Sequence, residues 1–205
     1  MKIKICGLTD PKEADYLNQI QADYAGFVLF FPKSKRNVSI PKAKEIMAAL
    51  SPSIQKVAVV VSPTPERVRE ICDSGFDVIQ IHGTLSEEIF PVLTIPVWRA
   101  FNVTQQKQYE DCHALPQVEG YVLDAPEPGS GKTFDWSLIS QFPKDGKLFF
   151  LAGGLHPDNV RTAIQALHPD GVDVSSGVEF TDRPGKDPAK IQAFATQVRK
   201  ASLDD

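Results

Sequence analysis

The sequence predicts an α/β fold, a (β/α)8 or TIM barrel, formed as one domain by residues 1–205. Short runs of β-branched and aromatic residues alternate with longer stretches of helical spacing along the whole chain. Dividing 205 residues among eight such units leaves about 26 residues for each, which is lean but within the range of this fold. An open doubly wound sheet is the alternative, and it would have to split consecutive units into two halves.

Strands and helices are predicted in strict alternation. The strands cover residues 3–6, 24–30, 56–61, 78–82, 97–101, 120–124, 148–152 and 172–175, each bounded by turn residues. The helices cover residues 11–20, 41–50, 65–74, 86–93, 104–114, 136–141, 157–167 and 188–200. Asp10, Thr64 and Asp187 each precede a proline, the pattern of an N-cap before a proline in the first helical turn.

Composition excludes several classes of protein. Hydrophobic residues make up 42% of the chain and charged residues 23%, as in ordinary globular domains. Cys6, Cys72 and Cys112 are an odd number without a C-x-x-C pair, which argues against a disulfide framework or a zinc site and for a reducing compartment. The N-terminus lacks a signal-peptide pattern, and no apolar run approaches the ~20 residues of a membrane span. We therefore expect a cytoplasmic protein without a metal site and without a membrane partner.

The charge balance favours a small ligand over a polymer. Lys and Arg number 22 against 26 Asp and Glu, a net charge of −4, and the basic residues form no block. This pattern argues against nucleic-acid binding. An anionic small molecule must then be held by local groups, and a phosphorylated one is expected.

Polar residues gather where the predicted strands end. In a barrel of this kind these ends meet at one mouth, where the chemistry takes place. The residues are Cys6, Lys33, Ser34, Lys35, Arg36, His82, Asp124, Gly153, Gly154, Ser175, Ser176 and Gly177.

The loops after the last two strands predict a phosphate site. Gly153 and Gly154 lie in one loop, and Ser175, Ser176 and Gly177 in the next. Small residues there expose backbone N–H groups, and with a short helix N-terminus they can bind an anion. Tight turns without a ligand are the alternative reading.

Single residues at the mouth leave alternatives open. Cys6 taken alone reads first as a small buried hydrophobe and only second as a nucleophile or base, because free cysteines at strand ends are more often the former. Asp124 ends an apolar strand, where a carboxylate must be capped, paired or functional. Arg36 could be a solvated loop charge, His82 could bind a backbone carbonyl, and Arg99 could face the mouth or an outward ion-pair partner.

Residues 124–136 form a connection too long for a minimal loop. Gly129, Ser130, Gly131 and Lys132 suggest a lid that closes over an anionic substrate. An ordinary surface loop is the alternative.

Taken together, ordered motifs resemble the phosphoribosylanthranilate isomerase family. They are KICGLT (4–9), GFVLFFPKSKR (26–36), IQIHG (79–83), LDA (123–125), GSGKTFDW (129–136), LAGGL (151–155), PDNV (157–160) and GVDVSSGVE (171–179). The resemblance spans nearly the whole chain. One departure is Pro128, where family members often carry a second glycine, so the predicted lid would be stiffer.

The resemblance implies an Amadori rearrangement in tryptophan biosynthesis: N-(5-phosphoribosyl)anthranilate becomes 1-(2-carboxyphenylamino)-1-deoxyribulose 5-phosphate, without a cofactor. It implies that Cys6 is the general base, that Asp124 is the general acid and that Arg36 binds the anthranilate carboxylate. A carboxyl group of raised pKa can protonate the ring oxygen, a thiolate can take the C2 proton, and a guanidinium can bind two oxygens.

Strand parity adds a prediction about the barrel interior. Side chains alternate between faces, so Lys4 shares the face of Cys6, and Asp173 shares that of Ser175. The first and last strands are neighbours in a closed barrel, and neither charge should be buried alone. We therefore predict that Lys4 pairs with Asp173 beneath the site, where Lys4 could help to hold Cys6 as a thiolate.

Other functions remain compatible with the fold. A non-catalytic phosphosugar-binding barrel would need the glycine and serine loops but not Cys6 with Asp124. A bifunctional isomerase of the histidine and tryptophan pathways typically has a carboxylate at the position of Cys6, and an indole-glycerol-phosphate-cleaving barrel shares the phosphate loops. A monomer and a homodimer are both compatible with the sequence.

Overall fold

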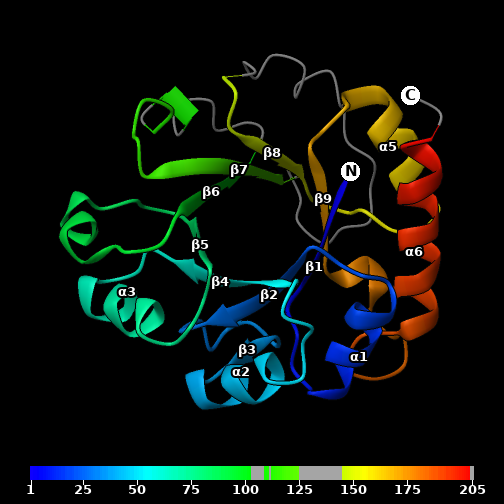
Figure 1. Ribbon diagram of the computed structural model, residues 1–205, viewed down its shortest axis with the longest axis horizontal. Coiled ribbons are helices and arrows are strands. Elements are labelled where there is room, and N and C mark those ends of the chain that lie inside the picture. The colour runs from blue at the N-terminus through cyan, green and yellow to red at the C-terminus, as the bar shows by residue number, and fades with distance from the viewer. Residues whose placement is uncertain (103–108, 111, 125–144, 204–205) are drawn as a thin grey trace.

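Parallel strands close into a barrel in the computed structural model, which describes residues 1–102, 109–110, 112–124 and 145–203 (Figure 1). The strands are β1 (Lys2–Cys6), β2 (Tyr24–Leu29), β3 (Asn37–Val38), β4 (Gln55–Val61), β5 (Val78–His82), β6 (Val97–Asn102), β7 (Val118–Asp124), β8 (Leu148–Leu151) and β9 (Gly171–Val174). The described strands follow the order β1-β9-β8-β7-β6-β5-β4-β2-β3, and β1 also pairs with β2, which closes the ring. The predicted barrel and its eight strands are confirmed, while the short β3 was not predicted.

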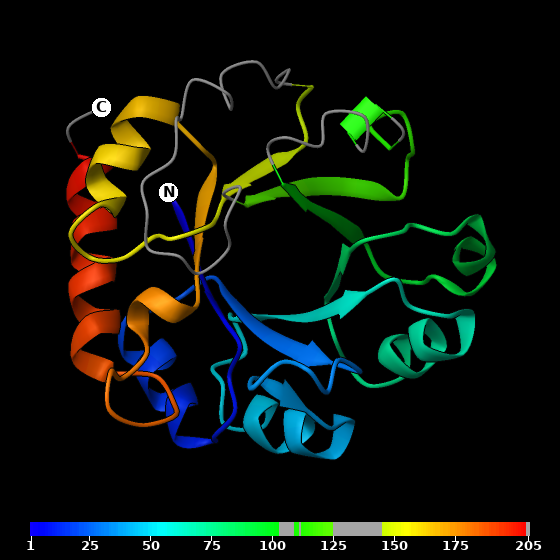
Figure 2. The ribbon, with the colours of Figure 1, turned by 180° about the vertical axis from the view of Figure 1, so that it is seen from behind.

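Helices surround the ring, as the view from behind also shows (Figure 2). They are α1 (Lys12–Gln19), α2 (Ile40–Met47), α3 (Pro65–Cys72), α5 (Val160–Leu167), α6 (Pro188–Ala201) and the 3-10 helices η1 (Glu87–Val92) and η3 (Ser176–Val178). The helix predicted over 86–93 is therefore a 3-10 helix. Pro91 lies inside it and lacks the N–H that an α-helix needs. The helix predicted over 136–141 and most of that over 104–114 lie outside the described residues.

The predicted helix caps are confirmed in part. Asp187 accepts hydrogen bonds from the backbone N–H groups of Ala189 and Lys190 and so caps α6. The Asp10 carboxylate likewise accepts from Lys12 N at 2.9 Å, although α1 itself begins at Lys12. Thr64 is the N-cap residue of α3 and Pro65 follows it in the first turn, as predicted, although the Thr64 side chain makes no capping hydrogen bond.

Apolar residues form two separate layers because side chains alternate along each strand. Ile5, Phe27 and Ile79 belong to the larger cluster between the strands and the helices. A second cluster inside the barrel includes Tyr24 and Val122. Cys6 belongs to this inner cluster, so its side chain lies on the barrel side of β1 as predicted.

Three aromatic rings fill the barrel interior. Trp98 stacks on Phe150 with ring centroids 4.7 Å apart, and Tyr24 meets Trp98 edge-on at 4.8 Å. Gly171 makes room for them, since a Cβ atom there would lie 2.4 Å from the Phe150 ring.

The predicted interior ion pair is confirmed. Lys4 and Asp173 are paired in the β1–β9 register, and Lys4 Nζ lies 2.8 Å from Asp173 Oδ2. Both side chains are buried, Lys4 completely. Parity and strand adjacency were therefore sufficient to place this pair.

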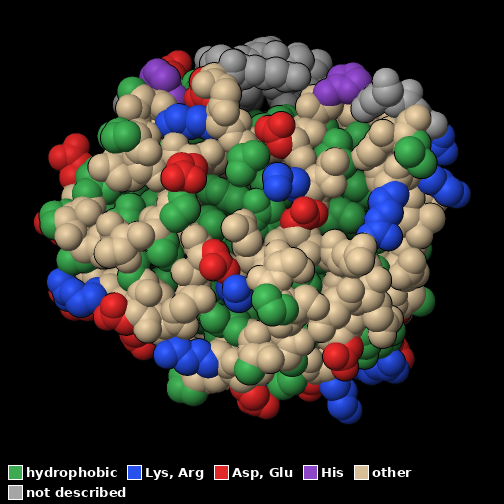
Figure 3. Space-filling view, viewed as in Figure 1, with side chains coloured by type: hydrophobic (Ala, Val, Ile, Leu, Met, Phe, Trp, Pro, Cys, Tyr) green, Lys and Arg blue, Asp and Glu red, His purple; other side chains and the backbone are tan. Residues whose placement is uncertain are grey.

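Acidic and basic side chains are interspersed on the face of the molecule shown in Figure 3. None of the helices in the described ranges is long and apolar enough to cross a membrane.

Candidate active site

A pocket of about 200 Å³ opens at the carboxyl ends of the barrel strands. It collects most of the site residues predicted from sequence, although they come from segments far apart in the chain. Those that line it are Cys6, Arg36, His82, Asp124, Gly153, Gly154, Ser175 and Ser176. Gly177 follows directly in η3. Gly129, Ser130, Gly131 and Lys132, the predicted lid, lie outside the described residues.

Cys6 ends β1 at the floor of this pocket, beside the Lys4–Asp173 pair. A Cβ atom on Gly26 would lie 2.9 Å from Cys6 Sγ and 3.1 Å from Lys4 Nζ, so the absence of a side chain at residue 26 leaves the space that these two groups occupy. Burial raises the pKa of the Cys6 thiol above its ordinary value. The charges of Lys4 and Lys186 act to lower this pKa, and that of Asp173 to raise it. The charge of Lys4 thus acts in the direction of the thiolate, but burial outweighs it and the pKa stays above its ordinary value.

Lys4 keeps its proton in this environment. Burial acts to lower the pKa of Lys4, but the Asp173 carboxylate and Cys6 more than offset it, so the pKa is raised. A permanent cation therefore lies between the thiol and the carboxylate.

The two glycine and serine loops lie against each other. Gly153 and Gly154 have φ angles of +82° and +66°, a conformation that glycine adopts without the strain of an L side chain. The other loop leads from Ser175 into the short helix η3, which begins at Ser176. This is the arrangement of small residues and a helix start that sequence reasoning predicted for a phosphate site.

Replacing Gly177 by Ala is expected to force these loops apart. A Cβ atom at residue 177 would lie 1.9 Å from the Leu155 carbonyl oxygen, which belongs to the backbone and cannot rotate away. We expect a loss of roughly 1–3 kcal/mol in stability and weaker binding of inorganic phosphate, measured by calorimetry. Gly146→Ala is the control, because a Cβ there meets nothing within 4 Å and only its φ of +87° is strained. Equal phosphate affinity in both variants would contradict this prediction.

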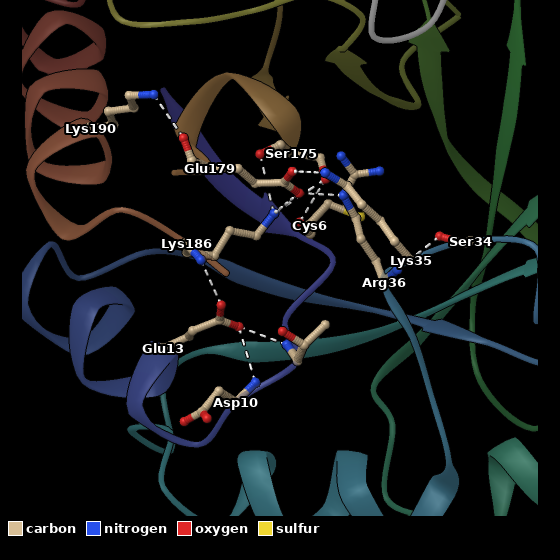
Figure 4. Close-up of polar contacts among 11 residues, drawn as sticks. Cys6, Asp10, Glu13, Ser34, Lys35, Arg36, Ser175, Glu179, Lys186 and Lys190 are labelled. Atoms are coloured by element: carbon tan, nitrogen blue, oxygen red, sulfur yellow. Dashed lines mark hydrogen bonds and ion pairs between the residues drawn. The ribbon is translucent and has the colours of Figure 1, made fainter. Parts of the chain in front are cut away.

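A buried carboxylate, Glu179, joins the basic residues around the pocket (Figure 4). Its Oε1 atom accepts a 2.5 Å hydrogen bond from Arg36 Nε, and its Oε2 atom lies 2.7 Å from Lys35 Nζ. Burial acts to raise the pKa of Glu179, but the hydrogen bonds from Arg36 and Lys35 and the charge of Lys186 lower it to about 2. Arg36 uses Nε on Glu179, and its two terminal nitrogens make no hydrogen bond within the described part of the chain, so they can bind another group.

Lys186 connects this carboxylate to the serine loop. Its Nζ atom is 3.3 Å from Glu179 Oε1 and donates to the Ser175 carbonyl oxygen at 3.2 Å. Ser175 Oγ in turn donates to the Cys6 carbonyl oxygen at 3.0 Å. In Figure 4 the Lys186 and Arg36 side chains reach the Glu179 carboxylate from two different loops. One carboxylate thereby fixes the Arg36 loop and the serine loop relative to each other.

His82 is neutral in the folded protein. Burial and the nearby Lys4 and Arg99 charges lower its pKa to about 4. Its Nε2 atom lies 3.0 Å from Gln80 Nε2, and in the neutral ring with its proton on Nδ1 this Nε2 accepts a hydrogen bond from the amide. The alternative that His82 binds a backbone carbonyl is not what these contacts show.

Arg99 lies on the outer face of β6, because the residues on either side of it, Trp98 and Ala100, belong to the inner cluster. Its guanidinium donates to the carbonyl oxygen of Ile81, within β5, at 2.8 Å and to that of Gly83, just after β5, at 2.7 Å. The contacts hold the loop that follows His82. Cys72 and Cys112 pack against the outer apolar cluster, as expected for structural cysteines.

Sequence reasoning gave no role to Gln80, Glu179 or Lys186. Gln80 lies two residues before His82 on the same strand. The alternation rule that put Lys4 on the face of Cys6 therefore also puts Gln80 on the face of His82. Glu179 closes the GVDVSSGVE motif, but the motif alone does not say what it contacts. Lys186 lies in a loop whose path has no period, and only the fold shows that it is buried.

Comparisons with known proteins agree on one family. Residues 3–197 match the family model described as N-(5'phosphoribosyl)anthranilate (PRA) isomerase. The N-(5'-phosphoribosyl)anthranilate isomerase of Chlamydia caviae is 37% identical, and the match covers 98% of each chain.

Solved structures agree with the sequence comparison. The phosphoribosyl anthranilate isomerase from Thermotoga maritima has a TM-score of 0.86 and 35% identity, covering 98% of this chain and 99% of that one. A second isomerase structure, in complex with reduced 1-(o-carboxyphenylamino)-1-deoxyribulose 5-phosphate, has a TM-score of 0.83 and 33% identity, with 98% and 99% coverage. The chain belongs to the N-(5'-phosphoribosyl)anthranilate isomerase family, a family of isomerases in tryptophan biosynthesis.

Proposed function

We propose that this protein rearranges N-(5-phosphoribosyl)anthranilate to 1-(2-carboxyphenylamino)-1-deoxyribulose 5-phosphate with Cys6 as general base and Asp124 as general acid. The observation that carries these roles is one pocket lined by a thiol, a carboxylate, a guanidinium and two small-residue loops. The loops would bind the phosphate at one end of the substrate. Arg36 would bind the anthranilate carboxylate at the other end with its terminal nitrogens.

Asp124 and Cys6 each transfer one proton in the proposed reaction, and a final tautomerisation follows. Asp124 donates a proton to the furanose ring oxygen, the C1–O bond breaks, and the nitrogen lone pair forms a C1–N iminium. The cation acidifies the C2 proton, which the Cys6 thiolate removes to leave an enolamine. Loss of the enol proton and protonation at C1 then give the ketone. Each step leaves atoms and charge balanced without an added reactant.

The first test is turnover of freshly generated phosphoribosylanthranilate by the wild type, followed as loss of anthranilate fluorescence. Activity supports the proposal. A folded protein that binds inorganic phosphate but does not turn over the substrate would leave the non-catalytic binding barrel as the better reading. Turnover of the histidine-pathway aminoaldose, measured in parallel, would identify the bifunctional alternative.

The Cys6 thiol is expected to ionise only in the alkaline range. Burial raises the pKa of this thiol, and its charged neighbours are Lys4, Lys186 and Asp173. Because the reaction needs a thiolate at Cys6 and a protonated Asp124 together, the pH dependence of kcat/KM reports both groups. The ultraviolet thiolate signal that is lost in Cys6→Ser reports Cys6 alone, and a signal already complete at pH 7 would contradict this prediction.

Glu179→Gln is expected to weaken substrate binding more than chemistry. The amide keeps the shape but loses the charge that holds Arg36 and Lys186, so we expect KM to rise about tenfold with little change in kcat. Lys35→Ala is the matched control: Lys35 is bound to the same carboxylate but 69% exposed, and its loss should change KM little. A fall in kcat alone would argue against a positioning role for Glu179.

A further inference from the structure

The floor of the pocket carries hydrogen-bond acceptors without donors. Asp173 Oδ1 and Gln80 Oε1 are both buried and have no hydrogen-bond partner among the described residues. Both residues line the pocket that holds Cys6. A buried acceptor that stays unpaired costs about 1–3 kcal/mol, so a pocket with two of them is suited to a ligand that brings donors.

Asp173 has a fixed geometry at this floor. Its Oδ2 atom is bound to Lys4 Nζ at 2.8 Å, and the side chain is 7% exposed. The carboxylate cannot rotate away without giving up the buried ion pair. Its second oxygen is therefore held in place before any ligand arrives, and the charge of Lys4 is already matched.

The position of Lys4 identifies which part of a ligand would reach this oxygen. Lys4 Nζ and Cys6 Sγ both lie within 3.1 Å of the point where a Cβ of Gly26 would be, and Lys4 is bound to Asp173. The thiol and the free carboxylate oxygen thus flank one ammonium group. A donor that reaches Asp173 Oδ1 is then carried by the carbon that Cys6 deprotonates or by the carbon next to it.

We propose that Asp173 Oδ1 accepts a hydrogen bond from the sugar hydroxyl on C2, the carbon from which Cys6 removes the proton. Lys4 is then a positioning residue, which touches no substrate but holds the acceptor in place. The charged acceptor both anchors the sugar and aligns the C2–H bond with the sulfur. This inference rests on the proposed function, because it takes the ligand to be the aminosugar phosphate.

Binding of two ligands to two proteins tests the proposal. The ligands are reduced 1-(o-carboxyphenylamino)-1-deoxyribulose 5-phosphate and the same compound without its C2 hydroxyl, and the readout is Kd by calorimetry. Wild type should prefer the hydroxyl compound by about tenfold or more, the effect of a hydrogen bond to a charged group. Lys4→Met/Asp173→Leu, which removes both charges together, should bind the two compounds equally.

The outcomes separate this inference from the proposed function. If wild type binds both ligands equally, the role of Asp173 is overturned but the proposed function stands. This is the result expected if an ordered water, and not the C2 hydroxyl, donates to Asp173 Oδ1. The same preference in wild type and double variant also overturns it. Failure of wild type to bind either ligand counts against the proposed function itself. If the double variant does not fold, Asp173→Asn takes its place in the test. Its preference for the ligand with the C2 hydroxyl should be smaller than that of the wild type.

Discussion

Cys6→Ser and Asp124→Asn are each expected to lower kcat by about 10²–10⁴-fold, the usual contribution of a positioned general acid or base. A hydroxyl is a far weaker base than a thiolate, and an amide has no proton to give to the ring oxygen. KM should change only modestly, because phosphate and carboxylate binding rest on other residues. Steady-state kinetics on purified, folded variants would measure both constants.

A matched control separates chemistry from packing. Cys72→Ser replaces a partly buried thiol at the end of α3, remote from the pocket lining, and should leave kcat unchanged. If Cys6→Ser lost no more activity than Cys72→Ser, Cys6 would not be the base. If either site variant raised KM alone, the residue would act in binding instead.

Lys4→Met is expected to cost about 3–5 kcal/mol of stability, because it leaves the Asp173 carboxylate buried without its partner. A typical domain has only ~5–15 kcal/mol in total, so a large part of the population would unfold on mild heating. Chemical unfolding monitored by circular dichroism would measure the difference. Lys12→Met, an exposed lysine on α1, should stay within about 0.5 kcal/mol of wild type.

The double variant Lys4→Met/Asp173→Leu is expected to recover most of that loss. Replacing a whole buried ion pair with apolar side chains is often neutral or stabilising, whereas removing one partner is not. If the double variant were as unstable as Lys4→Met, the cost would come from the space that Lys4 fills and not from the charge.

Much of the fold and the site could be predicted because both follow periodic rules. Alternation of strand and helix patterns gave the barrel, and parity placed Lys4 opposite Asp173 across a pair of strands 169 residues apart in sequence. Strand ends in a parallel barrel converge, which is why Cys6, His82 and Asp124 could be grouped from the sequence.

What could not be predicted lies where the chain has no period. Arg36 and Lys186 both contact Glu179 from loops, and no spacing rule gives the direction of a loop side chain. Arg99 looked undecided because a strand residue near the mouth faces in or out according to register, and β6 carries an irregularity against β7 between Val97 and Trp98. The 3-10 helix η1 differs from the predicted α-helix through a single proline, Pro91.

The close fit of Phe150 against Gly171 has a consequence for how these positions can evolve. The ring of one strand occupies the volume that any side chain on the next would need. A substitution at Gly171 is tolerated only after residue 150 has become small, while Phe150→Ala alone leaves a cavity in the barrel. Each single change is harmful, whereas the matched pair of changes is not. We therefore expect a small residue at position 150 to arise before a larger one at position 171. Among relatives the sizes of these two residues should be correlated.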